Sequence, residues 1–395
     1  MIGLFSKRCF GFCQEAIMNK KRKRFVICLV IISMAIGLIF GYVWYDFYDI
    51  SGLKMYKDEP IRSIYFQYND YTIIVTENGH GYMTGKEEGS NFRTYRNIEF
   101  HDNSYLHRAA AEFYDGKDGG IQRVFATRIQ FHTLFVTDQN VLYLVTDFHE
   151  VYCLAKNINF AAYDGEKVYT VDTAGEIHAI DISDKSDPKD TLLWDGKAKA
   201  LDIWNKRLFI LTEEGAVCEW NSEDKTLSEP LFTDVQEFTV TDSSYYDKQR
   251  TYIKCAIMTI HKKDGSLYVS GTFMDRTSAN ELLVHSFEEQ TLIGENISSF
   301  STSRTGCVML HADGTATYFG LRNDGSAQAG EADHITLPVQ KAIAVDTDSA
   351  NYVCVQTDTS FYMWSDDHVL FEPHSTVACP DRSIWSGQPY ILVTP

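Results

Sequence analysis

Residues 306–320 read GCVMLHADGTATYFG, which is an apolar alternating stretch, a polar turn and a second alternating stretch rich in aromatic side chains. Alternation with a period of two places apolar side chains on one face of a strand. Glycine readily adopts the positive φ of a tight hairpin turn. The segment therefore predicts a β-hairpin that turns at Gly314.

The same pattern occurs six more times along the chain. The other copies are YTIIVTENGHGYMTG from Tyr71, HTLFVTDQNVLYLVT from His132, KVYTVDTAGEIHAID from Lys167, RLFILTEEGAVCEWN from Arg207, AIMTIHKKDGSLYVSG from Ala256 and NYVCVQTDTSFYMWS from Asn351. Their turns fall at Gly79, Asn140, Gly175, Gly215, Gly265 and Thr359, and Thr359 is the one residue of these that does not favour positive φ.

A strand pair repeated about every 40–50 residues is typical of a β-propeller, in which each copy is one four-stranded blade. We therefore predict an all-β fold for residues 46–395, a β-propeller of seven blades preceded by one transmembrane helix. The segment Tyr390–Thr394 (YILVT) is expected to pair with a terminal blade and to close the ring.

The repeat resembles the regulator-of-chromosome-condensation family, whose blades run roughly H-T-x-A-L-T-x-D-G-x-V-Y-x-W-G and are often followed by N-x-x-G-Q-L-G. The matching residues are His132-Thr133-Leu134, Thr76 to Gly79, Thr212 to Gly215, Asp313-Gly314, Phe319-Gly320, Trp220, Trp364 and the tail Asn323 to Gly330 (NDGSAQAG). The resemblance implies a seven-bladed ring that binds proteins. Nuclear members of that family act as nucleotide exchange factors on chromatin, a role that the charge and the membrane segment described next argue against.

Residues 25–44 read FVICLVIISMAIGLIFGYVW and contain no charged residue. A helix of this length spans about 30 Å, the thickness of the hydrocarbon core of a bilayer. The basic run Lys20–Arg24 precedes it, and basic residues stay on the cytoplasmic side. We therefore predict a cytoplasmic basic tail over residues 1–24, a signal-anchor helix over residues 25–45 and an extracytoplasmic domain over residues 46–395 of a single-pass cell-membrane protein.

The alternative to an anchor is a cleaved signal peptide, which has a shorter apolar core and a small-residue cleavage site. The residues after Gly41, YVWYDFYD, contain no such site, so an uncleaved anchor is favoured. Met18, followed by NKKRKR, is an alternative start to Met1. Gly37 and Gly41 have the spacing of closely packed membrane helices, which leaves open a structural role in an envelope complex.

The net charge of the chain is −18, and residues 1–45 hold seven Lys or Arg against one Glu, so the remaining residues carry −24. Such a surface repels nucleic acid, and no nucleic-acid partner is predicted. The six cysteines of the domain are Cys153, Cys218, Cys255, Cys307, Cys354 and Cys379. An even number in an exported domain permits disulfides, whereas their apolar surroundings favour free, buried thiols.

The sequence lacks the motifs of common enzymes. His149-Glu150 begins the zinc-protease pattern H-E-x-x-H, but Cys153 stands where the second His is required. The aspartates at 181, 184, 187 and 190 do not fit a hand-type calcium loop, so solvated turn carboxylates are the favoured interpretation. No catalytic residue, metal or cofactor is predicted, and a non-enzymatic role is favoured.

Two insertions in the repeat carry the candidate binding residues. Asn103–Gly116 (NSYLHRAAAEFYDG) predicts a short helix that presents Tyr105, Phe113 and Tyr114, unless Phe113 and Tyr114 only fix it to the ring. The segment from Thr241 to Tyr252 (TDSSYYDKQRTY) predicts a polar loop with Tyr245 and Tyr246. Exposed aromatic side chains on loops often mark binding surfaces.

The favoured function is a protein-interaction module that is held at the membrane and binds an envelope or extracellular protein. The alternative is a carbohydrate-binding or glycan-active propeller at the cell envelope. Carboxylates gathered with aromatic platforms in the central channel would indicate this alternative.

Overall fold

The structure is a computed structural model that describes residues 61–67, 71–85, 111–125, 127, 132–146, 150–276, 281–322, 330–347, 353–357, 360–364 and 390–393. The chain divides into two compact units, and the unit of residues 54–88 and 95–395 holds every described strand. The predicted tail and anchor lie outside the described residues. Within those residues, no helix is long and apolar enough to cross a membrane.

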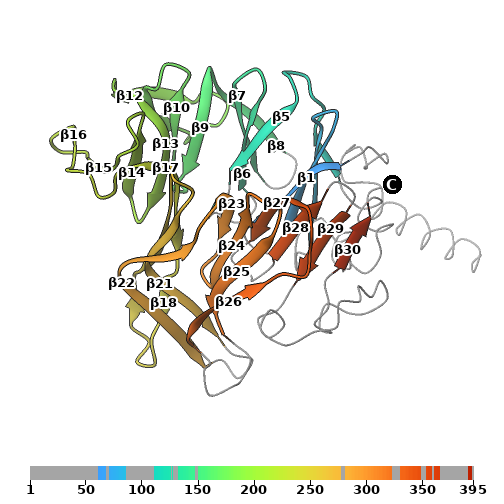
Figure 1. The fold of residues 1–395 in the computed structure, drawn as a ribbon. Coiled ribbons are helices and arrows are strands. Elements are labelled where there is room, and N and C mark those ends of the chain that lie inside the picture. The colour runs from blue at the N-terminus through green and yellow to red at the C-terminus, as the bar shows by residue number, and fades with distance from the viewer. Residues whose placement is uncertain are drawn as a thin grey trace, which may run out of the picture. The chain divides into compact units, whose positions relative to one another are not determined.

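The described strands form seven four-stranded antiparallel sheets, each built from strands in chain order, and one two-stranded hairpin (Figure 1). The first three sheets are β1 (Ile61–Gln67), β2 (Tyr71–Thr76), β3 (Gly81–Gly85) and β4 (Ala111–Tyr114); β5 (Ile121–Phe125), β6 (His132–Thr137), β7 (Val141–Thr146) and β8 (Glu150–Lys156); and β9 (Ile158–Tyr163), β10 (Lys167–Asp172), β11 (Ile177–Asp181) and β12 (Lys189–Trp194). The fourth sheet is β13 (Ala198–Trp204), β14 (Arg207–Thr212), β15 (Val217–Asn221) and β16 (Thr226–Leu227).

The fifth sheet contains β17 (Val235–Asp242), β20 (Ala256–Lys262), β21 (Leu267–Arg276) and β22 (Leu282–Gly294), and the two-stranded hairpin β18 (Tyr245–Tyr246) and β19 (Tyr252–Ile253) lies in the connection from β17 to β20. The last two sheets are β23 (Ile297–Thr302), β24 (Gly306–His311), β25 (Ala316–Leu321) and β26 (Ala332–Thr336); and β27 (Ala342–Thr347), β28 (Val353–Thr357), β29 (Ser360–Trp364) and β30 (Tyr390–Val393).

The two central strands of every four-stranded sheet are one copy of the repeat, which confirms the predicted hairpins. The turn residues adopt the expected left-handed backbone, with φ of 78° at Gly79, 59° at Asn140, 89° at Gly175, 93° at Gly215, 84° at Gly265 and 81° at Gly314. Thr359 lies outside the described residues.

The same turns join each sheet to the next. The carbonyl oxygen of Gly79 accepts a hydrogen bond from the N–H of Ile121, the first residue of β5, at 2.9 Å. Five more junctions have the same bond at 2.9 Å, from the N–H of the first residue of a sheet to the carbonyl oxygen of the preceding turn residue. The pairs are Ile158 with Asn140, Ala198 with Gly175, Val235 with Gly215, Ile297 with Gly265 and Ala342 with Gly314. Each turn residue therefore both closes its hairpin and places the first strand of the following sheet.

Apolar side chains fill the space between successive sheets. Between the second and third sheets, the buried cluster includes Leu134, Leu144, Val168 and Ile180. Similar clusters occupy the next four junctions. Burying one such side chain stabilises the fold by about 1.5–3 kcal/mol. The sheets therefore bury their faces against one another, as the blades of an all-β propeller do.

The first and last sheets also meet. Gln356 Nε2 donates a hydrogen bond to the carbonyl oxygen of Arg62 at 2.7 Å, and β1 contacts β27. The C-terminal strand β30 pairs with β29, which confirms that this segment joins a terminal sheet. Among the described strands, none is shared by the first and last sheets, so these two sheets meet by packing.

The short helix predicted over residues 103–116 is wrong in the part that the structure describes. Residues 111–114 form β4, which pairs with β3. Without β4, the main-chain N–H and C=O groups on the outer edge of β3 would have no partner in the sheet. The rings of Phe113 and Tyr114 pack against the ring of Phe135, with centroid distances of 5.7 and 4.9 Å respectively. The Phe113 ring is tilted, and the Tyr114 ring is edge-on. Sheet pairing and ring burial outweigh the weak helix preference of the Ala-rich sequence.

The five described cysteines are free, and their burial predicts an order of reaction with an alkylating reagent. Cys153 is exposed, whereas Cys218, Cys307 and Cys354 are buried. Burial raises the pKa of Cys307 to about 12 and raises that of Cys354 as well, so neither forms the reactive thiolate at neutral pH. Among these five thiols, iodoacetamide labelling of the native chain, mapped by mass spectrometry, is expected to modify Cys153 first and Cys307 and Cys354 only after unfolding. Early labelling of Cys307 would contradict this packing.

Candidate functional site

The connections within each four-stranded sheet lie at two opposite ends. In an antiparallel meander, the connections from the first to the second strand and from the third to the fourth lie at one end, and the central turns lie at the other. The longest connection that the structure describes throughout is residues 243–255, between β17 and β20, and it is of the first kind. We call this end the long-connection face. The opposite end of the sheets carries the short repeat turns.

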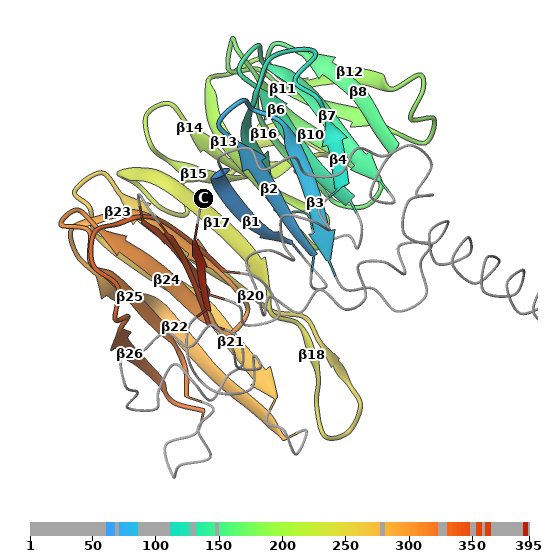
Figure 2. The ribbon, with the colours of Figure 1, turned by 90° about the vertical axis from the view of Figure 1, so that its right-hand side faces the viewer.

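Residues 243–255 form a structured projection on this face, which we call the arm. Strands β18 and β19 pair antiparallel, with Tyr246 opposite Tyr252, and Figure 2 shows the hairpin standing apart from the strands of its parent sheet. The two rings lie with centroids 5.0 Å apart at 46°. At the tip, Asp247 Oδ1 accepts the N–H groups of Gln249 and Thr251 at 2.9 and 2.7 Å. The predicted polar loop is therefore an ordered hairpin.

The base of the arm is fixed by polar contacts. The N–H of Ser243 donates to the carbonyl of Cys255 at 3.1 Å, and the Ser244 hydroxyl donates to Asp242 Oδ1 at 2.8 Å. The indole N–H of Trp204 donates to the same Asp242 oxygen at 2.8 Å. Because Trp204 belongs to the fourth sheet and Asp242 to the fifth, this contact ties the arm to the junction between two sheets.

Two cationic side chains also hold the arm in place, Arg276 from outside the arm and Lys254 from its C-terminal end. Arg276 Nη2, on β21, donates to the carbonyl of Tyr246 at 3.0 Å. Lys254 Nζ donates to Asn205 Oδ1, in the connection after β13, at 3.0 Å. These contacts orient the arm before any partner binds, which lowers the entropic cost of binding.

The outer part of the arm combines exposed aromatic rings with positive charge. Tyr246 is 57 % exposed and Tyr252 is 48 % exposed, and both are among the large hydrophobic side chains that the described domain leaves in solvent. Lys248 and Arg250 at the tip are also exposed. Tyr and Arg are enriched at protein interfaces. The arm thus carries an interface-like surface on a domain whose net charge is strongly negative.

The predicted site residues do not gather at one place. Tyr245 and Tyr246 lie side by side in β18, and partial burial raises the pKa of Tyr245. Phe113 and Tyr114 are 8 % and 2 % exposed in the core, a position that matches the alternative of fixing their segment to the ring. Tyr105 lies outside the described residues. The binding role of this set stays a prediction.

Sequence reasoning missed Tyr252 as a partner of Tyr246. The available signal was the segment Tyr245–Tyr252, in which aromatic residues flank the polar run DKQR as in a short hairpin. Their pairing needed the register of β18 and β19, which places the two rings opposite each other.

Carboxylates on the first strands of the sheets hold neighbouring sheets together. Asp202 Oδ2 on β13 accepts the N–H of Val240 at 2.6 Å, and the Ser301 hydroxyl on β23 donates to Asp346 Oδ1 on β27 at 2.8 Å. These side chains serve the junctions between sheets.

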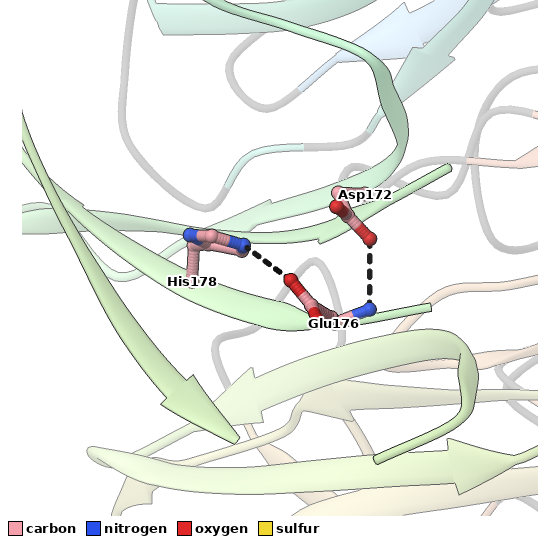
Figure 3. Close-up of side chains that lie close together, drawn as sticks. All are labelled: Asp172, Glu176 and His178. Atoms are coloured by element: carbon pink, nitrogen blue, oxygen red, sulfur yellow. Dashed lines mark hydrogen bonds and ion pairs between the residues drawn. The ribbon is translucent and has the colours of Figure 1, made fainter. Parts of the chain in front are cut away.

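A second cluster lies on the hairpin of β10 and β11, where Asp172, Glu176 and His178 come together (Figure 3). One ligand atom from each lies within 4.8 Å of the others. No metal was predicted from the sequence, and these residues were not among the candidate site residues. The aspartates discussed above as possible calcium ligands include Asp181 and Asp184, whose carboxylates accept the N–H groups of Ser183 and Ser186 at 2.9 and 3.0 Å, as turn residues do.

The chain matches no known protein family and no curated protein at the level of sequence. Among solved structures, it is similar to human WBSCR16, with 12 % identity and a TM-score of 0.49 over 77 % of this chain and 88 % of that one. It is also similar to Prp20p from Saccharomyces cerevisiae, with 12 % identity and a TM-score of 0.48 over 75 % and 82 % of the two chains. PorZ of Porphyromonas gingivalis gives 12 % identity and a TM-score of 0.49 over 83 % of this chain and 39 % of its own. At these scores the likenesses assign neither a family nor a function.

Proposed function

We propose that the chain is a single-pass membrane protein whose extracytoplasmic β-propeller binds an envelope or extracellular protein through the arm on its long-connection face. The observation that carries the proposal is the exposed, pre-oriented pair Tyr246 and Tyr252 beside Lys248 and Arg250. Exposed aromatic rings that are already ordered lose little entropy on binding, and they are frequent centres of binding energy.

The chemistry of the arm indicates an acidic partner surface. Lys248, Arg250 and Lys254 are exposed on the arm, and Asp247 uses its carboxylate to close the tip. Opposite charges across an interface speed association and exclude wrong partners. A partner with acidic groups around an apolar depression would fit both the cations and the two rings.

The membrane anchor and the family relation in this proposal rest on the sequence, and the number of blades rests on the order of the sheets. The uncharged stretch at residues 25–44 and the preceding basic run support a membrane anchor with the domain outside. Seven four-stranded sheets with contacts between the first and the last support a closed ring of seven blades. The repeat residues quoted above support a distant relation to the regulator-of-chromosome-condensation family. The structural study of Prp20p concerns its binding to Gsp1p and histones, and we propose only that this chain also binds proteins.

Proximity labelling from the domain in intact cells tests this function. A labelling enzyme is fused to the C-terminus of the full chain and supplied with a reagent that does not cross the membrane. The control carries residues 1–45 on an unrelated folded domain. The proposal expects a few acidic surface proteins to be enriched over the control. Labelling that occurs only inside the cell, or an identical set of proteins in the control, would contradict it.

A further inference from the structure

His178 is held in one orientation and presents an unused nitrogen to two carboxylates. Its Nδ1 lies 3.0 Å from Asp190 Oδ1 on β12. Its Nε2 is buried, has no hydrogen-bond partner and lies 3.9 Å from Glu176 Oε2. The side chain is 19 % exposed, so solvent reaches the cluster. A carboxylate on one imidazole nitrogen, with the other nitrogen directed at a ligand position, is the usual arrangement of a metal-binding histidine.

Asp172 carries more charge than its place in the turn requires. Its Oδ1 accepts the N–H groups of Ala174 and Glu176 at 2.9 and 2.8 Å, which closes the hairpin. In three other sheets a threonine hydroxyl accepts the counterpart of the Glu176 bond alone, since Thr76, Thr137 and Thr212 accept the corresponding N–H at 3.2, 3.3 and 3.3 Å. An uncharged hydroxyl therefore suffices for the turn. At this hairpin the carboxylate adds a negative charge and a second oxygen beside His178.

From this geometry we propose that Asp172, Glu176 and His178 bind one divalent transition-metal ion of the zinc class. One imidazole nitrogen and two carboxylate oxygens are ligands that Zn²⁺ accepts, and three protein ligands leave one position open. Ligand atoms around tetrahedral zinc lie about 3.4 Å apart, as its bond lengths require. The three ligand atoms here lie within 4.8 Å of one another. Rotation of the Glu176 side chain, which is 41 % exposed, can close this difference.

Asp190 acts as the positioning residue of this site. It does not contact the ion, but its bond to Nδ1 keeps Nε2 directed at the two carboxylates. Hard cations such as Mg²⁺ and Ca²⁺ prefer sites with oxygen ligands alone, so the imidazole selects against them. The open fourth position lets water or a side chain of another protein complete the coordination.

The ordinary alternative is an ion pair at the protein surface. In that case protonated His178 lies between Asp190 and Glu176, and Asp172 serves the turn alone. The two explanations differ in whether zinc binds and in which side chains it requires.

The test is zinc binding by the purified full chain, measured by competition with a chromophoric zinc indicator. Because other parts of the chain contain cysteines, the readout is the difference between variants. His178→Gln is expected to lose this site, with affinity at least 100-fold lower, and Asp172→Asn is expected to lose at least tenfold while keeping the oxygen that closes the turn. Asp190→Asn is expected to cost about 10–100-fold, the usual effect of removing a partner of a liganding histidine.

The matched control is His311→Gln. His311 also lies beside a repeat turn, but both its ring nitrogens have hydrogen-bond partners, Nδ1 the carbonyl of Glu295 at 3.1 Å and Nε2 the hydroxyl of Thr317 at 2.9 Å. This variant is expected to bind zinc as the parent chain does. Thermal unfolding without metal establishes that each variant is folded. Equal zinc affinity of the parent chain and of folded His178→Gln would overturn the proposal, as would equal affinity for Mg²⁺ and Zn²⁺.

Discussion

Replacing Gly79 by alanine is expected to lower the free energy of unfolding by about 3 kcal/mol, the upper part of the usual range for a point mutation. The residue has a φ of +78°, and a left-handed backbone costs a residue with a Cβ roughly 1–2 kcal/mol. The added Cβ would also lie 2.3 Å from Gly120 Cα, which belongs to the connection into the next sheet. Because this neighbour is backbone, it can move only if the bond from Ile121 to the Gly79 carbonyl is strained.

Gly265→Ala separates the two causes. Its φ is +84°, so the backbone strain is the same, but the nearest atom to an added Cβ is Asn296 Cα at 3.5 Å, an ordinary contact. This control is expected to lose only about 1–2 kcal/mol, the cost of the left-handed backbone alone. Urea unfolding of the full chain, followed by tryptophan fluorescence, compares the two variants. Equal losses would mean that the first two sheets do not approach as closely as described.

Removing the ring of Phe273 is expected to destabilise the domain by about 3–5 kcal/mol, the usual cost of replacing a buried Phe with Ala. Phe273 on β21 is fully buried. Its ring centroid lies 5.4 Å from that of Phe287 on β22 and 6.1 Å from that of Phe319 on β25. The side chain therefore joins the fifth sheet to the sixth, and its loss leaves a cavity at that junction.

Two comparison variants show whether burial causes this effect. Phe273→Leu keeps most of the volume and is expected to cost less than about 1.5 kcal/mol. Tyr246→Ala removes an aromatic ring that is 57 % exposed and is expected to change stability by no more than about 0.5 kcal/mol. Thermal unfolding and urea unfolding both measure the order of the stability losses in Phe273→Ala, Phe273→Leu and Tyr246→Ala. A loss in Tyr246→Ala as large as that in Phe273→Ala would contradict the assignment of the core.

The central strands could be predicted from the sequence because they are buried and end in residues with a special conformation. Strand β24, for example, is buried along nearly its whole length and ends at a turn with Gly314 in the left-handed region. The outermost strands gave no such signal. Strand β12 exposes its first four residues, and β16 has only two residues. Such strands are defined by the edge with which they pair, and their own composition carries little of that information.

The error at residues 111–114 has the same origin. Ala-rich composition and a terminal glycine favour a helix locally, but β4 is specified by the edge of β3 and by the rings of Phe135 and Tyr143 from the next sheet. A single sequence does not show contacts between segments so far apart in the chain.

The candidate sites divide in a similar way. Tyr246 could be found from the sequence because an aromatic residue in a polar insertion stands out. The cluster of Asp172, Glu176 and His178 matches no metal-binding motif, since its residues lie on two strands that a turn brings together. The register of β11 and β12 also brings Asp190 to His178, a contact that the spacing of the two residues in the sequence does not reveal.

The most direct test of the proposed function is to shorten the arm and measure what the domain still captures. Asp242 and Ala256 are opposite each other in β17 and β20, so an Asn-Gly turn can replace residues 243–255 without changing the sheet register. The double variant that carries Tyr246→Ala and Tyr252→Ala keeps the backbone of the arm and serves as a second test. The amounts of the parent chain and of each variant at the cell surface are matched. If the arm binds the partner, both variants lose at least tenfold in the proximity labelling of the proteins enriched by the parent chain. Undiminished labelling of those proteins by the folded, arm-shortened chain would contradict the account.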